Sequence, residues 1–326
     1  MSVSLADIQA AAERLRGHAL VTPLIESPAL NERMGVRVLL KAETLQRVGA
    51  FKFRGAYNRL VQLSDAERAR GVVAFSSGNH AQGVALAARL LGISALIVMP
   101  RDAPAVKVLA TEGFGAEIRF YDRLTDSREA IAAEVAQQRG SVVVPAFDDP
   151  HIIAGQGTVG LEMVAQAKAV GAVFDLVAAP ISGGGLLAGL ATAIKGLSPE
   201  TAMVGVEPEG FDDTLKSLQA GERRVFKPTG RSLCDALESP FPGELTFPIM
   251  QQTVADVAVV SDPEITEAMR YAFATLKLVV EPGGAAALAA LLAGKIDTAG
   301  KATVGLVLSG GNVDPEQFAR VLRGEI

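Results

Sequence analysis

One lysine stands between two phenylalanines in the stretch VGAFKFRGAYN, residues 48–58. Lysine usually keeps its ammonium in water, so Lys52, with Phe51 and Phe53 on either side, allows two interpretations. A surface strand alternates apolar and charged residues in this way. A lysine that acts as a nucleophile also needs apolar neighbours, because burial favours its neutral amine. These residues alone leave both interpretations open.

Three further stretches each bring a strand to a polar loop. In VVAFSSGNHAQG, residues 72–83, the loop leads into a helix whose free N–H groups suit a carboxylate or other anion. In FDLVAAPISGGGLLAG, residues 174–189, consecutive glycines let backbone N–H groups curl around a phosphate. In VGLVLSGGNVD, residues 304–314, the strand ends at Ser309, a neutral hydroxyl. The first and third loops also fit ordinary turns.

The middle loop has a second interpretation. Gly183, Gly185 and Ala188 have the spacing of a dinucleotide-binding loop, and Glu207 follows roughly 20 residues later, as a ribose-binding acid would. A nicotinamide nucleotide would use only this loop. Pyridoxal phosphate would use all three loops and the lysine, because its phosphate, ring nitrogen, aldehyde and amino-acid substrate each need a partner. We therefore predict pyridoxal phosphate as the cofactor.

Short apolar runs alternate with helical patterns along the chain. The expected strands are 36–41, 71–75, 94–100, 116–121, 141–145, 174–180, 202–207, 256–260 and 303–309. The expected helices include 79–91, 125–139, 185–196 and 262–276, an N-terminal helix capped by Ser4 and a buried helix in 283–294. This alternation predicts an α/β fold with parallel sheets, which hold ligands at the carboxyl ends of their strands. Segment 208–255 is less regular, and we expect it to cross the surface.

Composition excludes several classes of protein. The chain has 326 residues, of which 49% are hydrophobic, so it can bury a large core. Its net charge of −5 is spread over interspersed acids and bases, which argues against a nucleic-acid surface. Cys234 is the single cysteine, so a disulfide or a cysteine-rich zinc site is excluded and a reducing cytoplasm is expected. No apolar run reaches the ~18 residues of a membrane span. The expected binding partner is a small molecule.

Several motifs together resemble one family. GAFKFRGAYN, SSGNHAQG, DDPHIIAGQGTVGLE, SGGGLLAG, VEP and LSGGNVD are similar, in order and spacing, to the serine/threonine dehydratase and serine racemase family. That family includes enzymes acting on 3-hydroxyaspartate. The resemblance, which covers about residues 20–315, implies pyridoxal phosphate fold type II, like tryptophan synthase β. It implies two open, twisted, mostly parallel sheets flanked by helices, a large domain of 1–70 and 149–326, a small mobile domain of 71–148, and a homodimer.

The resemblance also implies a role for each motif residue. Lys52 would bind the aldehyde of the cofactor and then act as the base beside the substrate Cα. The implied cofactor ligands are Phe51 along the ring, Asn79 at the 3-hydroxyl, Ser309 at the ring nitrogen, and Gly183, Gly184, Gly185 and Leu186 around the phosphate. The implied ligands of the substrate carboxylate are Ser76, Ser77, Asn79, His80 and Gln156. Ser77 also matches the acid/base serine of the racemases.

A divalent-metal site is implied as well. Glu207 and Asp213, with the carbonyl of Phe211, match a site for Mg²⁺, Mn²⁺ or Ca²⁺ that some family members have. A solvated acidic turn is the alternative. Two positions depart from the family pattern: Ala50 replaces a common serine, and Ser182 replaces a common glycine. Because the chain ends soon after the third loop, we expect a catabolic enzyme without a regulatory domain.

The expected reaction is elimination of water from a small L-β-hydroxy amino acid, which yields a 2-oxo acid and ammonia. A neutral Ser309 at the ring nitrogen favours elimination over a long-lived carbanion. If Arg128, near the start of the helix 125–139, faces the site, it would bind a second carboxylate and favour 3-hydroxyaspartate; otherwise L-threonine or L-serine is expected. Arg128 could instead pair with Glu129 or Glu134 on the surface. An amino-acid racemase, an NAD-dependent dehydrogenase and a non-catalytic amino-acid sensor are the alternatives.

Overall fold

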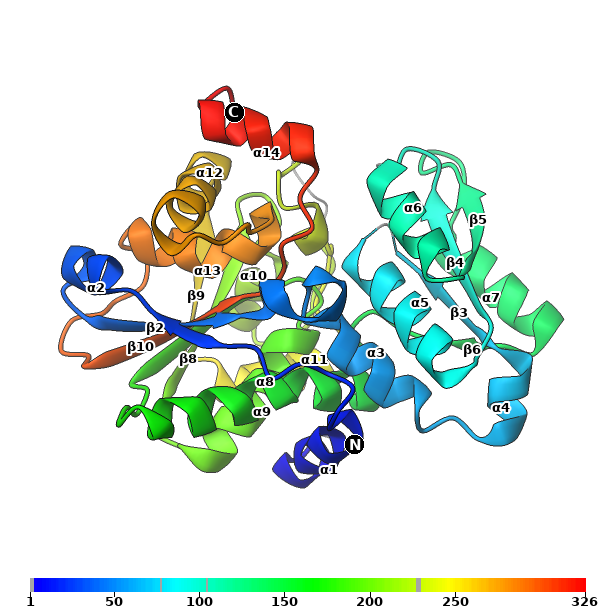
Figure 1. Ribbon diagram of the computed structural model, residues 1–326, viewed down its shortest axis with the longest axis horizontal. Coiled ribbons are helices and arrows are strands. Elements are labelled where there is room, and N and C mark those ends of the chain that lie inside the picture. Colours follow the sequence, from blue (N-terminus) through cyan, green and yellow to red (C-terminus); the bar gives the residue numbers. More distant parts are fainter. Residues whose placement is uncertain (1–2, 77, 104, 227–229) are drawn as a thin grey trace.

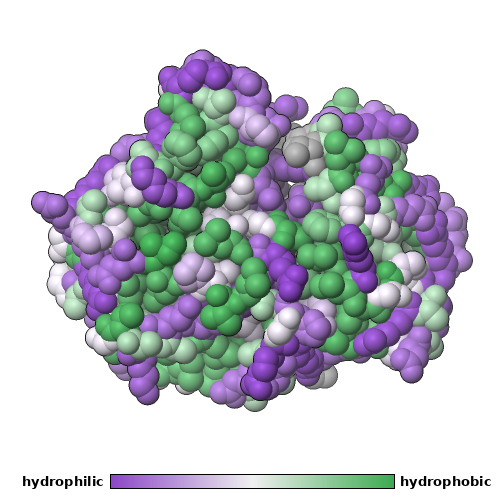
Figure 2. Space-filling model, viewed as in Figure 1, coloured by the Kyte–Doolittle hydropathy of each residue, from purple (hydrophilic) through white to green (hydrophobic). Residues whose placement is uncertain are grey.

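The computed structural model describes residues 3–76, 78–103, 105–226 and 230–326. They form two sheets that lie side by side, each with helices packed on its faces (Figure 1). This confirms the predicted α/β class with two mostly parallel sheets. In the same view, a notch in the surface separates the part that carries α14, Pro315–Arg323, from the part that carries α6, Ala105–Gly113 (Figure 2).

The larger sheet has six strands. Their order is β1 (Leu24–Glu26), β2 (Arg37–Ala42), β10 (Thr303–Leu308), β7 (Leu176–Pro180), β8 (Ala202–Pro208) and β9 (Asp256–Val260). All neighbours are parallel except β1 and β2. Alternate side chains enter opposite cores: Val38 and Leu40 pack with one set of helices and Leu39 with the other. Burial on both faces is why these strands read as continuous apolar runs.

Two groups of helices cover the larger sheet. On one face lie α12 (Asp262–Tyr271) and α13 (Pro282–Leu292). On the other lie α1 (Leu5–Leu15), α8 (Pro150–Ala169), α9 (Gly185–Leu197) and α11 (Thr246–Thr253). As predicted, Ser4 caps the first helix, because its hydroxyl accepts from the backbone N–H of Asp7. The buried helix expected in 283–294 is α13.

The smaller sheet has four parallel strands. Their order is β5 (Glu117–Tyr121), β4 (Ala95–Pro100), β3 (Val72–Phe75) and β6 (Val142–Val143). Helix α5 (Asn79–Leu91) packs on one face and α7 (Arg128–Arg139) on the other. Helix α3 (Lys52–Leu60) contacts both α5 and α8, so it joins the two halves (Figure 1). The division into a large domain and a small mobile domain stays a prediction.

Some sequence expectations need correction. Every expected strand is present, but β1 was not expected. The helix expected from residue 262 to 276 ends at Tyr271 and continues as a single π-helical turn, Ala272–Leu276. Segment 208–255 is not a purely surface excursion. It contains α10 (Asp213–Ala220) and α11, and α11 buries Ile249 and Met250 against α9, because its apolar side chains fill the core beneath the sheet.

Candidate functional site

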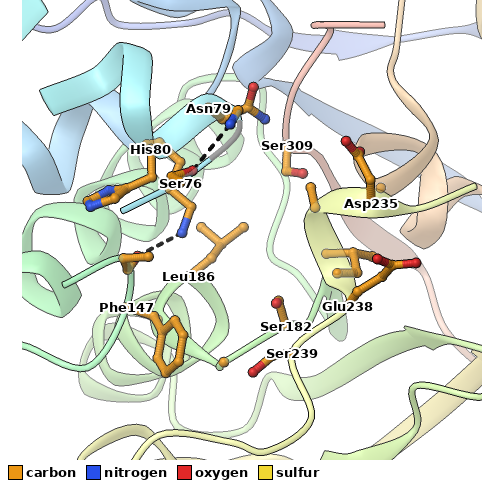
Figure 3. Close-up of a pocket in the computed structure, with 18 of the residues that line it drawn as sticks. Ser76, Asn79, His80, Phe147, Ser182, Leu186, Asp235, Glu238, Ser239 and Ser309 are labelled. Atoms are coloured by element: carbon orange, nitrogen blue, oxygen red, sulfur yellow. Dashed lines mark hydrogen bonds between the residues drawn. The ribbon is translucent and has the colours of Figure 1, made fainter. Parts of the chain in front are cut away.

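The three polar loops meet in one cavity between the sheets. Ser76 follows β3, Ser182 follows β7 and Ser309 follows β10, and all three line the same space with Lys52 (Figure 3). This is the expected place for a ligand, since the carboxyl ends of these parallel strands point toward it. The remaining lining residues include Phe147, Asp235, Glu238 and Glu281, which the sequence motifs did not single out.

Lys52 is the first residue of α3 and points into this cavity, so the surface-strand interpretation is wrong. Its Nζ donates to the Ala146 carbonyl at 2.7 Å and lies 5.2 Å from the centroid of the Phe51 ring. Burial lowers the pKa of Lys52 to about 8. The two phenylalanines have different surroundings: Phe51 lines the cavity, whereas Phe53 is fully buried in the core between α3 and α5.

Buried charges hold the start of α3. The guanidinium of Arg54 donates to both oxygens of Glu43 at 2.8 Å and to the carboxylate of Glu162 at 2.6 and 2.9 Å. Lys41 donates to Glu162 at 2.6 Å, so two cations balance two anions. Such a network is costly to break, because removing one member leaves a buried charge unpaired. It therefore fixes the backbone two residues after Lys52.

The loop after β3 presents a helix N-terminus. Asn79 and His80 open α5, so their backbone N–H groups have no acceptor within the helix. The Gly78 N–H donates to the Ser76 hydroxyl at 3.2 Å, which shapes the turn. This arrangement suits a carboxylate. Ser77, predicted as a carboxylate ligand and acid/base residue, lies outside the described residues.

The His80 ring is less suited to bind the substrate carboxylate than the resemblance implies. Its Nε2 lies 3.0 Å from the Val144 carbonyl, which can only accept, so Nε2 carries the proton. Its buried Nδ1 has no hydrogen-bond partner among the described residues. Burial and the charge of Lys52 lower the pKa of His80 to about 3, so the ring is neutral. We therefore expect only the backbone N–H of His80 to bind an anion.

The loop after β7 is a cradle that only glycine fits. Gly184 has a φ of +90°, and a Cβ there would meet Met250 at 2.6 Å. A Cβ on Gly183 would lie 2.3 Å from the Phe147 ring. Helix α9 begins at Gly185, so its first N–H groups, including that of Leu186, are free. A bare N–H cradle at a helix N-terminus fits a phosphate, and the residues present therefore fit pyridoxal phosphate.

The loop after β10 carries Ser309 into the cavity beside Glu281. Asn79 donates from Nδ2 to Glu281 Oε1 at 2.5 Å, and Asn312 donates to Asn79 Oδ1 at 2.8 Å. Sequence reasoning missed both Glu281 and Asn312. The available signal was the stretch EPGG at residues 281–284, an acid directly before the start of a helix.

Of two further residues predicted to bind the substrate, Arg128 reaches the cavity and Gln156 does not. Arg128 lines the cavity; its guanidinium lies 5.5 Å from the Phe75 ring centroid, and its Nε donates to Glu129 at 2.8 Å. It does not pair with Glu134. The structure does not bring Gln156 into the cavity: this side chain is 1% exposed and accepts from the Gly55 N–H.

The predicted metal ligands lie outside this cavity, at the end of β8. Both oxygens of Glu207 accept backbone N–H groups, from Thr214 and Leu215, at 2.9 Å. Glu207 thus faces the start of α10 and does not line the cavity, so it is not placed as a ribose-binding acid. Both oxygens of Asp213 are buried without a hydrogen-bond partner in the described chain. Burial and repulsion from Glu207 raise the pKa of Asp213 to about 8. Two close buried carboxylates and the nearby Phe211 fit a divalent cation.

Comparisons with known proteins agree with this geometry. Residues 15–310 match the family model described as pyridoxal-phosphate dependent enzyme. The chain is 46% identical to an L-threo-3-hydroxyaspartate ammonia-lyase of Pseudomonas sp, over 98% of both chains. It is 41% identical to a serine racemase of Schizosaccharomyces pombe, over 97% of this chain and 96% of the other.

A solved structure gives the same result for the fold. The structure of maize serine racemase superposes with a TM-score of 0.93 at 37% identity, covering 100% of this chain and 98% of the other. Separately, none of the helices in the described ranges is both long and apolar enough to span a membrane. This protein therefore belongs to the pyridoxal-phosphate dependent enzyme family, as the family model matched over most of the chain and the similar proteins show.

Proposed function

We propose that the protein is an ammonia-lyase that removes water from L-threo-3-hydroxyaspartate or a close β-hydroxy amino acid. The observation that carries this proposal is that Arg128 lines the same cavity as Lys52 and the two helix N-termini. The cavity thus offers three cationic or anion-binding positions, which suits a cofactor phosphate and a substrate with two carboxylates. The name of the Pseudomonas relative supports the same substrate.

The residues divide the work as follows. Pyridoxal phosphate, when bound, takes up the electron pair that the substrate Cα releases. The neutral Nζ of Lys52 accepts the α-proton, since its lowered pKa makes the free amine accessible near neutral pH. Ser309 would offer a hydroxyl rather than a carboxylate to the ring nitrogen, so it would add no negative charge there. Loss of the proton and the β-hydroxyl gives water and an enamine, which hydrolyses to a 2-oxo acid and ammonia.

Arg128 can leave its present partner at little cost. The Arg128–Glu129 pair is exposed, with side chains 44% and 58% accessible, and such pairs contribute little to stability. A second carboxylate on the substrate would give the guanidinium a bidentate partner in a less solvated place. L-serine and L-threonine have no such group. The residue should therefore discriminate between substrates by their charge.

The test compares ammonia release from L-serine, L-threonine and the four isomers of 3-hydroxyaspartate. Arg128→Met should lower kcat/KM for 3-hydroxyaspartate by about 10- to 100-fold, the loss of a hydrogen-bonded charge pair, and leave L-serine nearly unchanged. Arg139→Met, on the same helix but paired with Glu117, is the matched control. An equal loss on all substrates would contradict the role of Arg128. No ammonia from any substrate would contradict the lyase proposal.

A racemase on the same scaffold is the second candidate, because a serine racemase is among the similar proteins. Racemisation keeps the hydroxyl and releases no ammonia. Chiral analysis of the remaining amino acid, alongside the ammonia assay, therefore separates the two reactions. We also propose, from the resemblance, a cytoplasmic homodimer with a mobile small domain, and a divalent cation held by Glu207, Asp213 and the Phe211 carbonyl.

A further inference from the structure

Glu281 is a buried acid that the proposed chemistry does not use. It stands directly before α13, lines the cavity and is 4% exposed. None of the ion pairs among the described residues includes it. Burying a carboxylate without a cation is unfavourable, so the hydrogen bonds of Glu281 must offset the cost of its burial. The bond of interest is the one it accepts from Asn79 at 2.5 Å.

The orientation of the Asn79 amide follows from a chain of hydrogen bonds. The Val48 carbonyl can only accept, and Asn312 Nδ2 lies 2.6 Å from it, so this atom is the amide nitrogen. The same Nδ2 donates its other hydrogen to Asn79 Oδ1 at 2.8 Å. The remaining end of Asn79 is therefore Nδ2, which donates to Glu281. A flipped Asn79 would set two NH₂ groups against each other and an oxygen against the carboxylate.

The side-chain amide of Asn79 therefore keeps one N–H without an acceptor among the described residues. Asn79 lines the cavity, so this hydrogen is the donor that its side chain can offer to a ligand there. The position of the Glu281 carboxylate, which accepts from Asn79, is itself restricted by close packing. A Cβ on Gly310 would lie 2.1 Å from Glu281 Oε1, and the Glu281 N–H donates to the Gly310 carbonyl at 3.0 Å. The backbone of the third loop thus leaves Glu281 no room to move away.

We propose that Glu281 is a positioning residue that fixes the amide of Asn79, so that its free N–H donates to a ring oxygen of the bound cofactor. The inference rests on the cofactor placement proposed above. Because Asn79 begins α5 and Glu281 precedes α13, their hydrogen bond also ties a helix of the smaller sheet to one of the larger. In this proposal Glu281 acts through Asn79; it takes no part in proton transfer and does not contact the substrate.

The experiment uses the purified holoenzyme without substrate. Glu281→Gln keeps an oxygen that accepts from Asn79, so the visible spectrum of the bound cofactor and its dissociation constant should stay within about threefold of wild type. Glu281→Ala lets the amide turn and should weaken cofactor binding by about tenfold, the value of one hydrogen bond, and shift the absorption maximum. Glu209→Gln, which alters an exposed acid that does not line the cavity, is the matched control and should change neither.

Two results would overturn the inference. One is a wild-type spectrum and affinity for Glu281→Ala. The other is a loss in Glu281→Gln as large as in Glu281→Ala, which would mean that charge and not orientation matters. If Glu281→Ala does not fold, Asn312→Ala frees the other end of the amide and should give the same spectral shift; an unchanged spectrum would then refute the proposal. Because no substrate is present, the readout is independent of which amino acid is dehydrated.

Discussion

Two basic side chains in the cavity wall, Lys52 and His80, both have a lowered pKa, but the size of the shift differs. Burial lowers the pKa of Lys52 to about 8 and that of His80 to about 3. The pKa of His80 falls further because the charge of Lys52 adds to the effect of burial. Near neutral pH, the ring therefore stays neutral while the amine can exchange its proton. Of these two bases, Lys52 is the one that titrates in the working range.

The lowered pKa of Lys52 predicts the pH dependence of cofactor capture. Only the neutral amine attacks an aldehyde, and its fraction rises with pH through the pKa. In the protein freed of cofactor, the rate of covalent capture of pyridoxal phosphate should therefore rise with pH with a midpoint near 8. Stopped-flow absorbance between pH 6 and 10.5 measures it, and borohydride traps the product.

Lys52→Ala is the control for this experiment and should show no trapped cofactor. A midpoint near the ordinary lysine value of about 10.4 would mean that the side chain is solvated and that the cavity does not suppress its charge. Since the charged form is the one that burial penalises, no midpoint above that value is compatible with the geometry at all.

At the scale of single residues, sequence reasoning reached those that lie in strand-end loops. Lys52 and Ser309 stand in recognisable motifs, and the structure brings both to the cavity. Glu281 escaped because its partner Asn79 is 202 residues away, and no local spacing encodes that contact. The His80 ring orientation, set by the Val144 carbonyl, escaped for the same reason. Pairings across the chain are decided by the fold and not by the motif.

Helix α3 shows how an element determines the place of Lys52, the proposed catalytic residue. Two kinds of contact fix this helix: buried ion pairs around Arg54, and direct backbone contact with α8 at Gly55. The sequence showed the glycines but not their purpose, since a crossing of two helices needs small residues on both. The ion network was equally hidden, because Glu43 and Glu162 come from separate segments.

The crossing of α3 and α8 gives a test of this arrangement. A Cβ added at Gly155 would lie 2.6 Å from the Gly55 Cα and 2.7 Å from the Arg54 carbonyl oxygen, both backbone atoms. Gly155→Ala should therefore push the helices apart, lower the free energy of unfolding by about 1–3 kcal/mol and reduce activity by moving Lys52. Urea denaturation and the ammonia assay measure the two effects.

Gly113→Ala is the matched control, because Gly113 ends α6 and a Cβ there would meet nothing within 4 Å. This control should be neutral or slightly stabilising, since alanine favours the helix. Equal effects of the two substitutions would show that α3 and α8 can separate freely. In that case the close contact would not hold Lys52 in place.

Other elements were missed for identifiable reasons. Strand β1 has three residues at the edge of the sheet, too few to show a period. The π-helical turn after Tyr271 ends at Leu276 and is followed by Lys277, whose φ of +60° is uncommon for a residue other than glycine. The apolar residues of α11 read as part of an irregular segment because glycines and prolines surround them.

For the molecule as a whole, the alternation of strands and helices predicted the class of fold but not how the sheets face each other. The cavity depends on that placement, because it takes its lining from both. One ion pair spans it: Lys107 on α6 donates to Asp235 at 2.7 Å, and Asp235 begins the 3₁₀ turn Asp235–Leu237, which contacts α13. No pattern along the chain relates these positions, which are 128 residues apart.

The stability of the whole molecule should also respond to a divalent cation. The carboxylate of Asp213, which has no hydrogen-bond partner in the described ranges, and the neighbouring Glu207 form an unfavourable buried pair that a cation would neutralise. A cation that binds only the folded state at about 100 times its dissociation constant contributes about 2.7 kcal/mol, so Mg²⁺ should raise the Tm by about 3–6 °C. Differential scanning fluorimetry of the holoenzyme with MgCl₂, against NaCl of equal ionic strength, measures this rise.

Asp213→Asn separates the cation from a general salt effect. The variant removes the repulsion, so without Mg²⁺ it should be at least as stable as wild type, and added Mg²⁺ should change its Tm little. Glu209→Gln, which alters an exposed acid near the end of the same strand, should keep the full response. A Tm that Mg²⁺ leaves unchanged in wild type, or raises equally in Asp213→Asn, would mean that these carboxylates hold no cation and are kept neutral by protonation instead, as their raised pKa values would allow.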